Sequence, residues 1–142
     1  MIGAQPATER DVITVTLAEM ISKARGDVRE VQPVEACKAL DDGAFALVVD
    51  VREPGEFQEG HLPDAVNIPR GLLEVRADPS SPAADAALCE ARSGRILVYC
   101  TKGPGARSLL AAQTLASMGY EGAEALAGGL NAWVECGLPV ES

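Results

Sequence analysis

The chain has 142 residues, of which 47% are hydrophobic and 23% charged, as expected for a globular protein with one core. Its formal net charge of −9 disfavours nucleic acid and anionic lipid as partners. No apolar run approaches the roughly 20 residues that span a bilayer, and the first residues lack the pattern of a secretory signal. We therefore expect a cytoplasmic protein with no nucleic-acid or membrane partner.

The first half of the chain predicts helices that alternate with short strands. An amphipathic helix is expected over 8–24, with Gly26 ending it. In chain order there follow a strand at 28–33, a helix at 33–43, a strand at 45–51, a turn or short helix at 53–60, a strand at 65–69 and a helical turn at 71–76. The run FALVVDV at 45–51 is apolar apart from Asp50, which is typical of strands covered on both faces, as in parallel sheets.

The second half repeats this alternation. It predicts a helix after Pro82, a buried strand at 95–100, a long helix at 106–120, a short strand at 124–129 and a closing helix at 129–137. Strands that alternate with helices throughout indicate the α/β class with a mainly parallel sheet.

Four cysteines are present, and three of them stand in ordinary contexts. Cys37, Cys89 and Cys136 are interpreted as small buried hydrophobic residues. No cysteine pair has the C-x-x-C spacing, and His61 is the sole histidine, so neither a zinc site nor another metal site is expected. Disulfides are not expected in a reducing cytoplasm.

Cys100 differs because it ends a predicted buried strand and precedes a glycine-rich loop and a helix. Ligands of open α/β sheets bind at this end of the strands. The loop is a candidate anion site, because its glycines let peptide N–H groups turn inward and the following helix adds its positive end. Its residues are Thr101, Lys102, Gly103, Pro104, Gly105, Ala106 and Arg107. With the charges of Lys102 and Arg107, this setting favours a thiolate, so Cys100 is a candidate nucleophile that needs no general base.

Four segments of the chain resemble single-domain rhodaneses, a family of sulfurtransferases, in their order and spacing. They are VVDVREPGEFQEGHLPDAVNIPRG at 48–71, ILVYC at 96–100, RSLLAAQTLASMGY at 107–120 and ALAGGLNAWVECGLPV at 125–140. The resemblance implies the rhodanese fold, a five-stranded mostly parallel sheet with helices on both faces. Residues 28–142 would form this rhodanese-like domain, and residues 1–27 would be an N-terminal helical extension.

The resemblance also implies the chemistry. Cys100 would take a sulfane sulfur from thiosulfate or another small anionic donor, such as a persulfide, and would itself become a persulfide. The acceptor would be a thiol, cyanide or a sulfur-accepting protein. No cofactor is expected, because preorganised loop amides would stabilise the charge on the sulfur.

Five residues outside the loop are expected to support the site. They are Asp50, Arg52, Glu53, His61 and Arg70. Asp50 and Glu53 are interpreted as orienting or fold-stabilising acids, and Arg52 as a partner in a structural ion pair. We expect His61 to be a hydrogen-bonded structural histidine. Arg70 could face either the mouth of the pocket or the solvent.

Two other functions stay open. Six residues separate Cys100 from Arg107, a longer loop than the family and its related phosphatases commonly have. A wider loop could admit a bulkier persulfide donor, and it leaves open whether Arg107 contacts the anion. A phosphatase or arsenate reductase of the related fold would favour a histidine where this chain has Tyr99. A non-enzymatic sulfur-relay or binding module would form the persulfide and pass its sulfur only to a protein.

Overall fold

The fold is described by a computed structural model that covers residues 14–103 and 105–142. Its five strands form one sheet in the order β1-β5-β4-β2-β3, and each neighbouring pair is parallel. The strands are β1 (Arg29–Val31), β2 (Phe45–Asp50), β3 (Val66–Asn67), β4 (Arg95–Tyr99) and β5 (Ala123–Leu126). This sheet confirms the α/β prediction.

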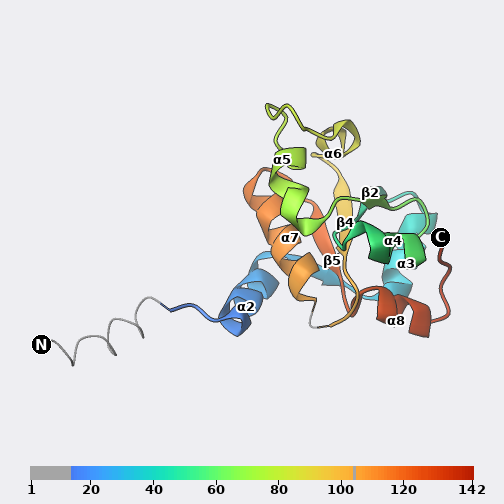
Figure 1. Cartoon of the computed structure of the whole chain (residues 1–142). Helices are drawn as coiled ribbons and strands as arrows, with labels where there is room; N and C mark the ends of the chain where they lie inside the picture. The colour runs from blue at the N-terminus through green and yellow to red at the C-terminus, as the bar shows by residue number, and fades with distance from the viewer. Residues whose placement is uncertain (1–13, 104) are drawn as a thin grey trace, which may run out of the picture.

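Helices cover both faces of the sheet. They are α2 (Leu17–Asp27), α3 (Pro33–Asp41), α4 (Pro54–Glu59), the 3₁₀ turn η1 (Arg70–Leu72), α5 (Leu73–Ala77), α6 (Ala86–Glu90), α7 (Ala106–Ser117) and α8 (Gly129–Glu135). Figure 1 shows α2, α5, α6 and α7 on one side of the sheet and α3, α4 and α8 on the other. Among the described residues, no helix combines the length and apolar character needed to cross a membrane.

Alternate residues of the central strands supply two separate cores. Val49 and Val98 belong to the core under α7, while Val48 and Leu97 belong to the core under α3 and α8. Successive side chains of a strand point to opposite faces, so a strand buried on both faces is apolar on both, except where a buried polar group is paired. This accounts for the apolar run at 45–49, which is followed by Asp50, a buried residue paired with Arg52.

The N-terminal helix differs from its predicted bounds. Helix α2 begins after Thr16, whose side chain caps it, and it continues past Gly26. The start of the predicted helix at 8–13 lies outside the described residues. Ile21 and Ala24 are buried in the core under α7, so this helix packs onto the domain. A boundary between residues 27 and 28 stays a prediction.

The sheet brings the ends of two central strands to one place. Asp50, the last residue of β2, lies beside Tyr99, the last residue of β4. The peptide N–H of Val51 donates to the carbonyl oxygen of Tyr99 over 3.1 Å. The segments after β2 and β4 therefore leave the same edge of the sheet side by side, where ligands of parallel sheets bind.

Candidate active site

Cys100 comes directly after β4 and borders a hollow at this edge of the sheet. The residue is only 3% exposed, but it lines a cavity of about 400 Å³. The other lining residues are Glu56, Thr101, Lys102, Gly103, Gly105, Ala106 and Arg107. The structure thus brings the described residues of the predicted loop together around Cys100, while Pro104 lies outside the described residues. A small molecule in this hollow would meet Cys100.

The sulfur of Cys100 has a hydroxyl group as its neighbour. Its Sγ lies 3.4 Å from Ser108 Oγ and 3.9 Å from the carbonyl oxygen of Lys102. The Ser108 hydroxyl also donates to the carbonyl oxygen of Gly105 over 3.1 Å. Ser108 was not predicted from the sequence. Its signal would have been a small hydroxyl residue in the first turn of the helix that follows the cysteine loop.

The start of helix α7 makes this place favourable for negative charge. Gly105 precedes the helix in the left-handed conformation, with φ of 79°, and its N–H donates to the carbonyl oxygen of Lys102 over 3.0 Å. The first peptide N–H groups of a helix have no acceptor within the helix, and the helix dipole is positive there. A thiolate or persulfide at Cys100 would gain from this end of α7.

Helix α8 holds the cysteine backbone from the other side. The N–H of Leu130 donates to the carbonyl oxygen of Cys100 over 2.9 Å, and that of Asn131 to the carbonyl oxygen of Thr101 over 2.8 Å. Gly129 is buried with φ of 63°, and a Cβ atom there would lie 2.7 Å from the Cys100 carbonyl oxygen. Only glycine lets α8 approach the backbone of Cys100 this closely.

The loop arginine is bound by a carboxylate. Arg107 Nη1 lies 2.9 Å from Glu56 Oε1, and Nη2 lies 3.2 Å from Glu56 Oε2. Thr101 Oγ1 accepts from Arg107 Nη2 over 3.0 Å and donates to Glu56 Oε2 over 3.2 Å. The hydrogen bonds from Arg107 are the main reason why the pKa of Glu56 falls to about 2. Glu56 was not predicted as a site residue, because it lies 44 positions before Cys100 in another segment.

Lys102 differs from Arg107 in its surroundings. Lys102 is an exposed residue on the rim of the hollow, and within the described part of the chain its ammonium group has no carboxylate partner. Of the two cations predicted for the site, Arg107 is therefore ion-paired and Lys102 is hydrated.

Asp50 and Arg52 form a buried ion pair behind the site. They are 0% and 4% exposed, and Arg52 Nη2 lies 2.7 Å from Asp50 Oδ2. Burial by itself would lower the pKa of Arg52, but the hydrogen bonds and charge of Asp50 raise it overall. Arg52 also donates to the carbonyl oxygen of Gly60, and Asn67 donates to the carbonyl oxygens of both Asp50 and Arg52. The pair fixes the turn after β2 and does not line the hollow around Cys100.

Glu53 and His61 flank helix α4. Glu53 is exposed at the start of the helix, where its N–H donates to Glu56 Oε1 over 2.9 Å. His61 stacks on Phe57 with ring centroids 3.9 Å apart, and its Nδ1 lies 2.9 Å from the carbonyl oxygen of Leu62. Both residues hold α4 in position, and α4 carries Glu56 to the hollow.

Arg70 lies elsewhere. It donates to Glu74 Oε1 and to Thr114 Oγ1, each over 3.0 Å, on the side of the sheet covered by α7. It does not line the hollow around Cys100. Of the two places considered for it, the structure does not support the mouth of the pocket.

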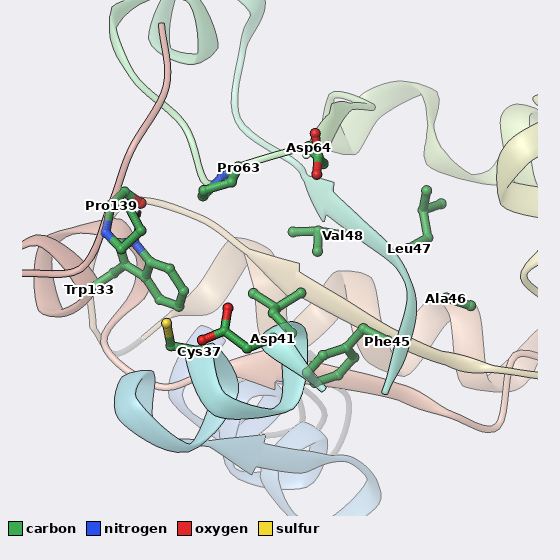
Figure 2. A pocket seen from close by; sticks show the side chains of 11 residues that line it. Cys37, Asp41, Phe45, Ala46, Leu47, Val48, Pro63, Asp64, Trp133 and Pro139 are labelled. Carbon is green, nitrogen blue, oxygen red and sulfur yellow. Dashed lines mark hydrogen bonds between the residues drawn. The ribbon is translucent and has the colours of Figure 1, made fainter. Parts of the chain in front are cut away.

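A second hollow of about 300 Å³ lies between α3 and β2, away from Cys100. Figure 2 shows Cys37 and Asp41 on its α3 side and Trp133 beside them. Burial raises the pKa of the Cys37 thiol, and the charge of Asp41 adds to the effect. Both influences keep Cys37 protonated, so it does not share the surroundings of Cys100.

Cys89 and Cys136 line neither of these two hollows. Cys89 is half-buried, with its sulfur 3.7 Å from the carbonyl oxygen of Arg76. Cys136 is exposed at the end of α8, which corrects its interpretation as a buried residue. Over residues 14–103 and 105–142, no three histidine, cysteine, aspartate or glutamate side chains gather as metal ligands would.

Comparison with known proteins agrees with the geometry. The model of the Rhodanese-like domain family matches residues 32–136. A sulfurtransferase of Allochromatium vinosum is 32% identical over 113 residues, which are 80% of this chain and 94% of that protein. Some longer curated relatives match over a part of their length, since the chain spans 45% of one from Synechocystis and 19% of one from Zea mays.

Two solved structures share the architecture. A Rhodopseudomonas palustris protein, described as of unknown function and a possible tyrosine phosphatase, is 32% identical with a TM-score of 0.83, over 91% of this chain and 96% of that one. The human single-domain sulfurtransferase TSTD1 is 33% identical with a TM-score of 0.64, over 76% and 96% of the two chains.

Proposed function

Since this chain belongs to the rhodanese-like domain family, we propose that it is a sulfurtransferase whose Cys100 carries the sulfur as a persulfide. The observation that carries the proposal is the position of Cys100 on a hollow at the positive end of α7, next to two cationic residues of its own loop. None of the other three cysteines lines this hollow. The relatives that are named sulfurtransferases support the same reaction class.

In the first half-reaction the Cys100 thiolate attacks the outer sulfur of a donor. With thiosulfate, a bond forms between Sγ and the outer sulfur, and the S–S bond of the donor breaks. Sulfite leaves with the electron pair of that bond, and Cys100 becomes a persulfide anion. No proton must be abstracted, so the reaction needs no general base when Cys100 is ionised.

In the second half-reaction an acceptor takes the outer sulfur. Cyanide or a thiolate attacks that sulfur, the persulfide S–S bond breaks, and its electron pair returns to Sγ. The products are thiocyanate, or a persulfide of the acceptor, and the Cys100 thiolate. The site thus returns to its starting state without any change in redox balance.

Ser108 and α7 would stabilise the anionic states of this cycle. In the thiol form the S–H donates to Ser108 Oγ, and the hydroxyl donates to the carbonyl oxygen of Gly105. When the sulfur is ionised, rotation of the hydroxyl lets it donate to Sγ instead, which is a charge-assisted hydrogen bond. The first turn of α7 adds unpaired N–H groups at the same place, already oriented before the reaction.

Intact mass spectrometry after incubation with thiosulfate or an alkyl persulfide tests the proposal. We expect the protein to gain one sulfur atom, and Cys100→Ala to gain none. Cys37→Ala is the matched control, since it also removes a thiol that lines a hollow, and it should still gain the sulfur. Cyanide should then release the sulfur as thiocyanate. A wild-type protein that gains no sulfur from either donor would refute the proposal.

A phosphatase is the second candidate, because the Rhodopseudomonas palustris neighbour is described as a possible tyrosine phosphatase. Hydrolysis of an aryl phosphate that is lost in Cys100→Ala, with no sulfur gained from either donor, would favour it. Tyr99 stands where the resemblance predicts a histidine for that activity, so we expect no such hydrolysis. A relay module would gain the sulfur and release it to a protein thiol but not to cyanide.

A further inference from the structure

A carboxylate stands in the hollow where an anionic donor would bind. Glu56 reaches the hollow from α4, and it lines the same space as Cys100, Lys102 and Arg107. The formal charges of these lining side chains are +1 for Lys102, +1 for Arg107 and −1 for Glu56, which sum to +1. With Cys100 as a thiolate, the sum is zero. A carboxylate at this place opposes the entry of anions.

Glu56 also engages the cation that an anion would use. Both terminal nitrogens of Arg107 donate to the two carboxylate oxygens, and Thr101 bonds to both side chains. Such paired, charge-assisted hydrogen bonds are strong and geometrically specific. A donor that binds to Arg107 must therefore either displace Glu56 or share the guanidinium with it.

The repulsion between Glu56 and a sulfur donor depends on the charge of the donor. Thiosulfate is a dianion that must approach a thiolate, and of the two cationic side chains among the described residues that line the hollow, Lys102 is the one without a carboxylate partner. The protonated form of an alkyl persulfide is uncharged, so a nearby carboxylate does not repel it. The two donor classes should thus respond differently to the charge of Glu56.

We propose that Glu56 determines the class of sulfur donor, by holding Arg107 and so favouring organic persulfides over the inorganic dianion. This inference rests on the proposed sulfurtransferase function. In the favoured reaction the Cys100 thiolate attacks the outer sulfur of R–S–SH, the donor S–S bond breaks, and R–S⁻ leaves with its electron pair. Cys100 then carries S–SH, and atoms and charge balance. Glu56 is a positioning residue, because it acts through Arg107.

The test compares the second-order rate constants of sulfur loading for two donors. The probes are thiosulfate and the persulfide of 2-mercaptoethanol, with loading followed by quenched-flow mass spectrometry. Glu56→Gln removes the charge but keeps the shape and an acceptor oxygen. We expect it to raise the rate constant with thiosulfate about tenfold and to change that with the persulfide less than about twofold. The gain with thiosulfate should shrink at about 1 M salt, because salt screens the charge.

Two further variants separate the local effect from other causes. Glu59→Gln removes one charge from the exposed end of the same helix, and it should leave the ratio of the two rate constants unchanged. Glu56→Asp keeps the charge, so the ratio should stay within about threefold of that of the wild type. Urea unfolding of each variant shows whether it is folded.

The inference would be overturned if the ratio of the two rate constants did not change in folded Glu56→Gln. An equal fall of both rate constants would also overturn it, because it would mark a purely structural role. An equal rise in Glu59→Gln would overturn it too, since the effect would then come from net charge. In each of these cases the wild type still loads sulfur, and the proposed function stands. If the wild type loads sulfur from neither donor, both the proposed function and the inference on Glu56 are refuted.

Discussion

Replacing Gly129 by alanine should move the backbone that carries Cys100, the proposed nucleophile. The added Cβ would lie 2.7 Å from the carbonyl oxygen of Cys100, whereas ordinary contact begins near 3.4 Å, so α8 and the loop must separate by about 0.7 Å. The left-handed conformation of residue 129 costs about 1 kcal/mol for alanine, and overpacking of this kind costs about 1–3 kcal/mol more. We therefore expect the free energy of unfolding to fall by about 2–4 kcal/mol.

Gly137→Ala is the matched control. Gly137 has φ of 74°, close to the value at Gly129, but an added Cβ would meet nothing within 4 Å. It should lose only about 1 kcal/mol, as measured by urea unfolding. Sulfur loading of Cys100 should fall about tenfold or more in Gly129→Ala and stay unchanged in Gly137→Ala, because small displacements of a reacting atom slow a reaction strongly. Equal losses of stability with equal loading rates would refute a tight contact between α8 and the cysteine backbone.

Three further outcomes are expected. Ser108→Ala should slow sulfur loading of Cys100 about tenfold in the same mass assay, since the proposed charge-assisted hydrogen bond is lost; an unchanged rate would contradict this role. Tyr99→Phe removes the hydroxyl that accepts the buried N–H of Leu62 over 3.0 Å, and urea unfolding should show a loss of about 1–3 kcal/mol, whereas no loss would mean another acceptor takes its place. Because the fold lowers the pKa of Glu56 to about 2, its ion pair with Arg107 stabilises the fold above the ordinary pKa of 4.5 and is lost as the pH falls towards 2. The side chains of Glu56 and Arg107 are 36% and 41% exposed, so the ion pair contributes about 1 kcal/mol to the free energy of unfolding. The difference in this free energy between wild type and Glu56→Gln should vanish as the pH falls from 4.5 towards 2; a difference that stays constant with pH would contradict the stabilising role of the ion pair.

The fold could be predicted because its signals are local. The apolar run at 45–51 and the alternation of strands with helices require only neighbouring residues to be compared, and both gave the parallel sheet. The bounds of α2 were predicted less accurately than the sheet. Its apolar positions continue on either side of Thr16, and the capping hydrogen bond of that residue decides where the helix begins.

The sequence by itself determined Cys100 and its loop, because a strand end, glycines and a helix start follow one another along the chain. Only the tertiary structure decided what surrounds them. Glu56 binds Arg107 from 51 positions away, and Gly129 lies against the Cys100 backbone from another helix. Contacts between distant segments depend on how helices pack across the sheet, and local patterning does not carry that information. The net charge of the hollow therefore depends on the tertiary contact between Glu56 of α4 and Arg107 of α7 as well as on the loop sequence.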